Sequence, residues 1–170
     1  MRMSSILRAV RVAANLARVA YIAGEARQEM LDTLGEAIDH IAAALAALGD
    51  AYEQLGTVPA DRLEEELFGP VQAAYGRAKR THVGFARRHG LPDRTFAPAS
   101  PGLPSTGVRG FVDNAVASVG EADAVLSELQ DSMMPVEVGD PELRAGLGEV
   151  RELLAGVPGR AREFMRTLGR

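Results

Sequence analysis

Apolar residues in the first third of the chain are separated by steps that alternate between three and four residues. Such steps place side chains along one face of an α-helix that packs with a left-handed supercoil. The same register continues backwards to Ile6 through smaller residues, so helix is predicted from about residue 4 to 55, with Gly24 as the expected point of any bend. The larger members of this seam are Leu31, Leu34, Ile38, Ile41, Leu45, Leu48, Tyr52 and Leu55.

Three later segments also follow helical spacing. Two apolar seams, which begin at Val108 and Leu143, repeat the first period, and the stretch from Asp61 to His89 is less regular but still helical. The pattern therefore predicts four helices of nearly equal length, over residues 26–55, 60–89, 107–134 and 141–168.

Capping residues and prolines mark where these helices begin and end. Asp61 with Glu64 has the spacing of an N-terminal capping box, and Asp140 precedes a proline in the first helical position. Gly90 can adopt the left-handed conformation that ends a helix. The stretch 91–107 holds four of the nine prolines and is predicted to be a linker or a long crossing loop.

Together these elements predict an all-α fold. Helices of equal length that are joined by short links pack as antiparallel neighbours. We therefore expect residues 25–170 to form an up-down four-helix bundle with left-handed heptad packing. Residues 1–24 remain as a basic amphipathic N-terminal helix that either extends the first helix or folds back as a fifth helix. In it, Arg8, Arg11 and Arg18 form a polar stripe opposite small apolar residues. Small residues suit close helix contact, so a partner helix is preferred to a membrane surface.

The composition narrows the chemistry that is open to this fold. The 170 residues include no Cys, which removes disulfides, cysteine zinc sites and thiol nucleophiles. Hydrophobic residues make up 46% of the chain and charged residues 25%, as in a folded soluble protein. No apolar stretch reaches the roughly 18 residues of a membrane span, and arginines interrupt the N-terminal stretch that a secretory signal would need. A cytoplasmic protein is expected, with leaderless secretion left open.

The basic residues are unevenly distributed, although the net charge is only −4. In an up-down bundle the C-terminal ends of the second and fourth helices share one pole with residues 1–24, and acidic residues collect at the other pole. Helix-dipole complementarity explains part of this layout, and a binding surface is the alternative explanation. The candidate contacts for an anion or a partner are Arg8, Arg11, Arg18, Arg77, Lys79, Arg80, Arg87, Arg88, Arg162 and Arg166.

The sequence shows no catalytic or metal-binding set. It lacks the inward-facing Glu and Glu-x-x-His motifs of di-metal bundles, a G-x-S-x-G elbow, a phosphate loop and a dinucleotide fingerprint. His82 falls near an apolar line, where a core histidine is commoner than a general base. We therefore expect no enzyme, no metal, no cofactor and no small-molecule substrate.

The alanine-rich heptads in "IDHIAAALAALGDAYEQL" and "VGEADAVLSELQDSM" resemble those of small actinobacterial helical proteins, some of which are similar to substrates of type VII (ESX) secretion. The Trp-x-Gly turn that marks that family is missing, because the chain has no Trp. The stretch "YIAGE" matches a Tyr-x-x-x-acid secretion signal, but it precedes the predicted bundle instead of following it. The resemblance carries over no functional residue.

These observations predict a non-enzymatic helical bundle that acts through protein–protein contact and associates with itself or with a helical partner. The alternative is an anion-binding module that uses the basic pole for nucleic acid or anionic lipid headgroups. A pI of about 5.4 argues against a dedicated nucleic-acid binder. A substrate of type VII secretion is a third, minor interpretation.

Overall fold

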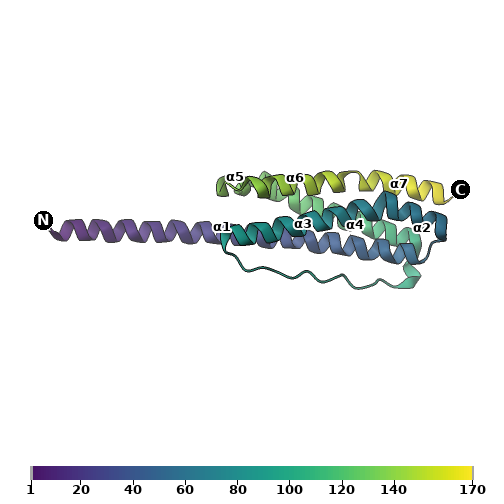
Figure 1. Ribbon diagram of the computed structural model, residues 1–170, viewed down its shortest axis with the longest axis horizontal. Coiled ribbons are helices and arrows are strands. Elements are labelled where there is room, and N and C mark those ends of the chain that lie inside the picture. Colours follow the sequence, from purple (N-terminus) through teal and green to yellow (C-terminus); the bar gives the residue numbers. More distant parts are fainter. Residues whose placement is uncertain (1, 170) are drawn as a thin grey trace.

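The computed structural model describes the backbone of residues 2–169 and the side chains of residues 5–169. Helices make up 86% of the chain and pack together, and the described part contains no strand, so the all-α prediction is confirmed. Figure 1 shows the helices α1 (Arg2–Glu53), α2 (Thr57–Leu63), α3 (Gly69–His89), α4 (Gly107–Asp131), α5 (Met134–Val138), α6 (Pro141–Ala155) and α7 (Val157–Leu168). A π-helical turn, η1 (Glu64–Phe68), joins α2 to α3, and a 3-10 turn, η2 (Pro104–Thr106), precedes α4.

Helix α1 is one uninterrupted helix of 52 residues, which corresponds to about 78 Å. No proline occurs within it, and its many alanines have the highest helix propensity. Gly24 lies inside the helix without ending it. The C-terminal part of α1 is enclosed by other helices, whereas the N-terminal part projects alone (Figure 1).

Prolines explain the interruptions in the second and fourth helical segments. Pro70 lies in the first turn of α3, directly after the widened turn η1. Because proline has no N–H and its ring crowds the carbonyl four residues earlier, a regular α-helical turn is disfavoured there. Pro158 stands in the same way at the start of α7, where α6 ends before Gly156. The interruptions that both prolines predict are confirmed.

The end signals of the helices are confirmed at two positions and wrong at a third. The Asp140 carboxylate accepts a hydrogen bond from the Leu143 N–H at 2.9 Å and so caps α6. Gly90 ends α3 in the left-handed region, with φ 63°. Asp61 lies inside α2 and caps nothing. The helix begins at Thr57, one turn before the predicted start, and Gly56 in an extended conformation precedes it.

The helices do not alternate in direction along the whole chain. Helix α3 runs antiparallel to α6, since Arg77 pairs with Glu149 and Arg88 with Asp140. Both α3 and α4 also run antiparallel to α1, so α3 and α4 point the same way (Figure 1). The expected strict up-down order is therefore wrong between the second and third segments.

The linker between α3 and α4 is the reason for this change of order. An extended chain over residues 91–103 can span roughly 43 Å, which exceeds the roughly 38 Å length of α4. The linker therefore returns along the full side of the bundle before α4 begins (Figure 1). Acids of α1 hold it there: Asp39 accepts from the Arg94 guanidinium at 2.8 Å, and Asp50 accepts from the Gly102 N–H at 2.7 Å.

The predicted apolar seams are largely buried in all four segments, and in α1 a neighbouring line is buried beside the predicted one. Every predicted core position of the second segment is buried, namely Leu63, Leu67, Val71, Ala74, Ala78, His82 and Phe85. In α1, Leu45 is only half-buried and Tyr52 is exposed. Five residues of the predicted seam are buried, and an equally buried neighbouring line of α1 shares three of them: Met30, Leu34, Ala37, Ile41, Ala44, Leu48 and Ala51. Small alanines on this line let α4 approach closely, and α1 makes its most extensive contact with α4.

Gly146 marks a close approach between α6 and α3. A Cβ atom at this position would lie 2.6 Å from Cγ2 of Thr81 and closer still to its Oγ1. We expect Gly146→Ala to lower the free energy of unfolding by about 1–3 kcal/mol, the usual cost of overpacking. Gly148 in the same helix has no atom within 4 Å of such a Cβ. Gly148→Ala should instead raise that free energy by about 0.5–1 kcal/mol through helix propensity. Urea denaturation of both variants tests this, and effects of equal sign would contradict the close approach.

Candidate interaction surface

Helix α1 continues beyond the other helices as a free-standing extension, which we define as residues 5–22. Figure 1 shows that it projects from the end of the bundle where α3 ends and α6 begins. Its large apolar side chains are all at least 53% exposed: Ile6, Leu7, Val10, Val12, Leu16, Val19, Tyr21 and Ile22. Helices in proteins gain most of their stability from tertiary packing of an apolar face, and an isolated helix is only marginally stable in water. Within the described chain, this surface has no element packed on it.

The buried line of α1 continues into the extension. Steps of three and four residues lead back from Met30 to Val12, and we call their outer part the uncovered seam: Val12, Leu16, Val19 and Ala23. The sequence pattern predicted a neighbouring line instead, from Ile6 through the alanines to Gly24. Both lines contribute to the core of α1, and the uncovered seam continues the line that includes Met30. The residues that extend the core register are therefore larger than expected.

A groove lies at the root of the extension, between α1 and α5, and we call it the root groove. Its volume is about 330 Å³. Nearby, Nε of Arg27 is buried and has no hydrogen-bond partner among the described residues, although buried polar atoms are nearly always paired. The groove is lined by Val19, Ile22, Ala23, Ala26, Arg27, Met134, Glu137 and Val138.

The sequence pattern did not reveal helix α5, because residues 107–134 were predicted as one helix. The structure ends α4 at Asp131, and Met133 takes the left-handed conformation with φ 63°. The chain then turns back toward α1 and begins α5. Pro135, in the first turn of α5, was the one local signal for this break.

The predicted basic contacts are used in different ways. Arg8, Arg11 and Arg18 are exposed on the extension and form no ion pair with any described residue. Lys79 lies over the ring of Tyr75, with Nζ 4.3 Å from the ring centroid. Within the described residues, Arg80, Arg87 and Arg162 likewise form no ion pair. The others do: Arg77 with Glu149, Arg88 with Asp140 and Glu142, and Arg166 with Glu163.

The predicted single basic pole is wrong. Helix α7 lies beside α2 and η1, where Arg62 donates a hydrogen bond to Thr167 at 2.8 Å. Arg162 and Arg166 therefore stand at the opposite end of the bundle from Arg87 and the extension (Figure 1). The shared pole depended on strict alternation of helix direction, which the long linker removes.

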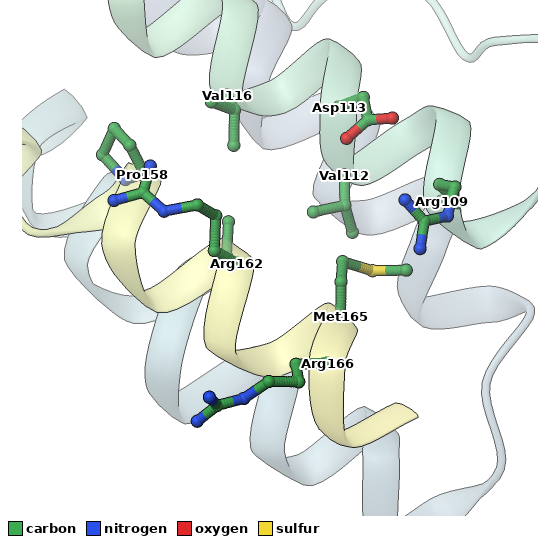
Figure 2. Close-up of a pocket in the computed structure, with 9 residues that line it drawn as sticks. Arg109, Val112, Asp113, Val116, Pro158, Arg162, Met165 and Arg166 are labelled. Atoms are coloured by element: carbon green, nitrogen blue, oxygen red, sulfur yellow. The ribbon is translucent and has the colours of Figure 1, made fainter. Parts of the chain in front are cut away.

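A second groove, of about 340 Å³, lies between α4 and α7. Its apolar floor includes Val112 and Met165, and three arginines stand around it. Figure 2 shows that the guanidinium groups of Arg162 and Arg166 point away from that of Arg109. Because the three cations do not converge on one point, this groove lacks the geometry to hold a compact anion.

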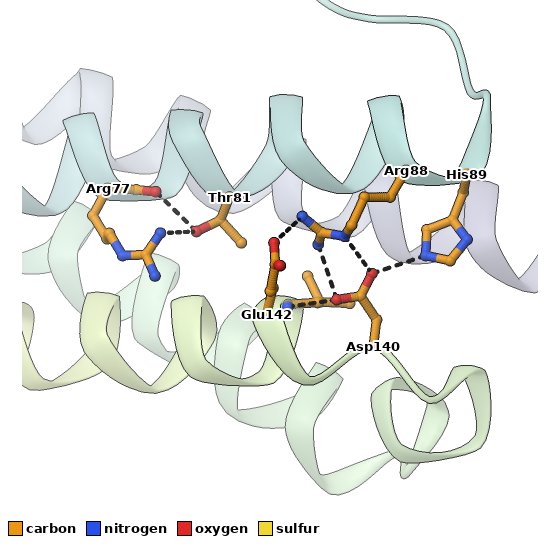
Figure 3. A network of polar contacts seen from close by, with 7 residues as sticks. Arg77, Thr81, Arg88, His89, Asp140 and Glu142 are labelled. Atoms are coloured by element: carbon orange, nitrogen blue, oxygen red, sulfur yellow. Dashed lines mark hydrogen bonds and ion pairs between the residues drawn. The ribbon is translucent and has the colours of Figure 1, made fainter.

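The C-terminal end of α3 is fixed by a polar network around Asp140, shown in Figure 3. Arg88 donates to both carboxylate oxygens of Asp140, at 3.0 and 2.9 Å, and His89 Nε2 lies 2.8 Å from Oδ2. Burial raises the pKa of Asp140, but the hydrogen bonds from Arg88, the Leu143 N–H and His89 outweigh it and leave the pKa below its ordinary value. Arg88 thus serves the fold instead of a ligand.

His82 is buried beneath the linker, as its place near an apolar line predicted. Its ring meets the edge of Phe96 with centroids 5.0 Å apart, and its side chain is 2% exposed. Burial lowers the pKa of His82 below 6.5, against the opposing effect of Asp93, whose carboxylate lies 4.0 Å from Nδ1. The imidazole therefore favours its neutral form and packs as a core side chain.

Neither metal-ligand clusters nor membrane spans are found in the described part of the chain. No group of three or more His, Asp or Glu side chains there could hold a metal ion. No helix there is long and apolar enough to cross a membrane.

Comparison with known proteins gave no relative for this chain. No protein-family model matches the sequence, and neither curated proteins nor solved structures gave a similar protein.

Proposed function

We propose that the protein is a non-enzymatic helical scaffold that associates with a second copy of itself through its N-terminal extension. The observation that carries this proposal is the uncovered seam, which extends the core register of α1 onto a helix with nothing packed against it. The proposal treats residues 25–170 as a four-helix bundle with left-handed heptad packing, a rigid body that presents the extension.

Burial of the uncovered seam supplies the driving force for association. Each Val or Leu side chain that passes from water to a packed interface contributes roughly 1.5–3 kcal/mol. Val12, Leu16 and Val19 are each at least 53% exposed in the single chain, and a symmetric dimer buries each of them twice. A helix that is stabilised by such packing need not be stable alone.

Sedimentation velocity of the full chain at micromolar concentration tests self-association. We expect a dimer, with a frictional ratio well above that of a compact protein because α1 is about 78 Å long. A monomer over the whole concentration range would contradict the proposal.

Anion binding is the alternative function, and the unpaired arginines of the extension are the observation that favours it. Arg8, Arg11 and Arg18 stand at the same end of the molecule as Arg87, and phosphate contacts of this kind weaken steeply with salt. We expect that any retention on heparin at low salt is lost when these three residues are replaced by serine. Arg109→Ser is the matched control, because it removes one exposed charge far from the extension. A wild type that is not retained would exclude this alternative.

We retain the expectation of a cytoplasmic location. A link to type VII secretion stays a minor alternative. The secretion link rests on the style of the alanine-rich heptads, and "YIAGE" lies within and just beyond the extension. A helical protein other than a second copy remains the competing partner for the uncovered seam.

A further inference from the structure

We propose that the two copies pair antiparallel, so that the tip of each extension lies in the root groove of the other. This arrangement rests on the proposed self-association and adds its geometry. In this arrangement the root groove is part of the interface, and the N-terminal end of the partner's helix contacts α5.

The position of the root groove on α1 is the first argument. Val19, Ala23 and Ala26 line the groove, and the first two also belong to the uncovered seam. Helices α4 and α5 thus pack on the buried line of α1 as far as the groove. From the groove toward the N-terminus, the uncovered seam continues with no helix packed on it. A second helix that packs on the seam and points toward the bundle must therefore end in the groove, beside Met134 and Val138.

The side chains along the seam fit this arrangement. Antiparallel pairing about a two-fold axis near residue 14 sets Val12 against Leu16 of the second copy, and Ala9 against Val19. Each pair joins a smaller side chain to a larger one, which allows interdigitation at a normal interhelical distance. Residues 5–9 of one copy then lie over residues 19–23 of the other, at the root groove.

Charge selects the antiparallel over the parallel orientation. Residues 1–24 contain four arginines and no acid, whereas Glu25 and Glu29 follow immediately and Glu137 lines the root groove. Antiparallel pairing brings the basic tip of each copy to the acidic root of the other, with Arg8 beside Glu137. Parallel pairing would set the two basic tips side by side, and like charges in contact oppose association.

Cysteine cross-linking tests the orientation, because the natural chain has no Cys. We expect an equimolar mixture of the full-length Ala9→Cys and Val19→Cys variants to form a mixed disulfide under mild oxidation, while Val19→Cys alone forms none. In the antiparallel dimer the two positions numbered 19 are about 15 Å apart along the axis, beyond the roughly 7 Å between Cα atoms that a disulfide spans. Val58→Cys, which is 71% exposed on α2, is the control for random collision.

The outcomes separate this arrangement from self-association itself. A disulfide in Val19→Cys alone, without a mixed disulfide, would establish parallel pairing and overturn the proposal while the dimer stands. A dimer in sedimentation that gives neither disulfide would place the interface elsewhere and would also overturn it. A monomer would end both proposals, and a monomer that floats with vesicles containing anionic lipid would assign the extension to a membrane surface.

A charge exchange tests the root groove. We expect Glu137→Arg and Arg8→Glu each to weaken the dimer about 3–10-fold at low salt, and the double variant to recover most of the affinity. Glu121→Arg, on the exposed side of α4, is the control for a change in net charge and should leave the affinity unchanged. Failure of the double variant to recover affinity, with dimers still present, would exclude contact between the tip and the groove.

Discussion

Replacing Leu16 and Val19 by glutamate is expected to convert the protein to a monomer whose bundle stays folded. Both side chains are 65% exposed in the single chain, so a charge at either position meets water and not the core. In a dimer each substitution occurs twice and places a carboxylate in an apolar contact, at a cost of several kcal/mol for the four sites together. We therefore expect the dissociation constant to rise at least about a thousandfold, measured by sedimentation velocity.

The control for this experiment is Val58→Glu, which adds a charge at an equally exposed position on α2 at the far end of the bundle. It should leave association intact. Circular dichroism of each variant reports whether the bundle is folded. A variant that stays dimeric would place the interface on another surface.

Asp140→Ala is expected to lower the free energy of unfolding by about 2–4 kcal/mol, the largest effect of any single polar substitution in the bundle. The carboxylate is 4% exposed and joins α6 to the end of α3. It accepts from the Leu143 N–H, from Arg88 and from His89, so its removal takes away a helix cap and leaves partly buried donors unpaired. Asp140→Asn should lose less, because the amide oxygen still caps the helix. Urea denaturation at pH 7 measures both.

The pH dependence of stability provides an independent test of the Asp140 network. The pKa of Asp140 is lower in the folded protein than its ordinary value of 3.8, so the unfolded chain binds its proton first as the pH falls. The stabilisation is therefore complete well above pH 3.8 and is lost as the pH drops through the folded pKa. We expect the stabilities of wild type and Asp140→Asn to begin to converge below about pH 4 and to meet only below the folded pKa of Asp140. Curves that stay parallel at every pH would show that the ionised carboxylate contributes nothing.

The sequence pattern was sufficient for the helices and insufficient for their order. Hydrophobic spacing located the buried positions of α3, α6 and α7, where the predicted apolar lines are buried through Phe85 and Phe164. In α1 the alanines at 37, 44 and 51 are as suitable for a close contact as the leucine at 45, so spacing alone could not choose between two lines. The direction of α4 depends on whether the linker turns at once or runs back, and its length permits both.

The sequence predicted only part of the candidate surface, because spacing alone does not show which line of α1 is buried. Residues 1–24 were identified as surplus to the bundle, but the face that we propose for a partner follows from the buried register of α1, which only packing reveals. The root groove joins residues that are more than a hundred positions apart in the chain, from Val19 to Val138. Local spacing carries no information about such a contact.

The tip of the extension and the end of α7 lie at opposite ends of the molecule (Figure 1). A single α1 is about 78 Å long, and two antiparallel copies that overlap by about 37 Å would form a rod of roughly 120 Å. Both α7 helices would then face outward at the far ends of that rod. In such a pair, the number of residues in one helix, α1, would set the distance between the two α7 helices.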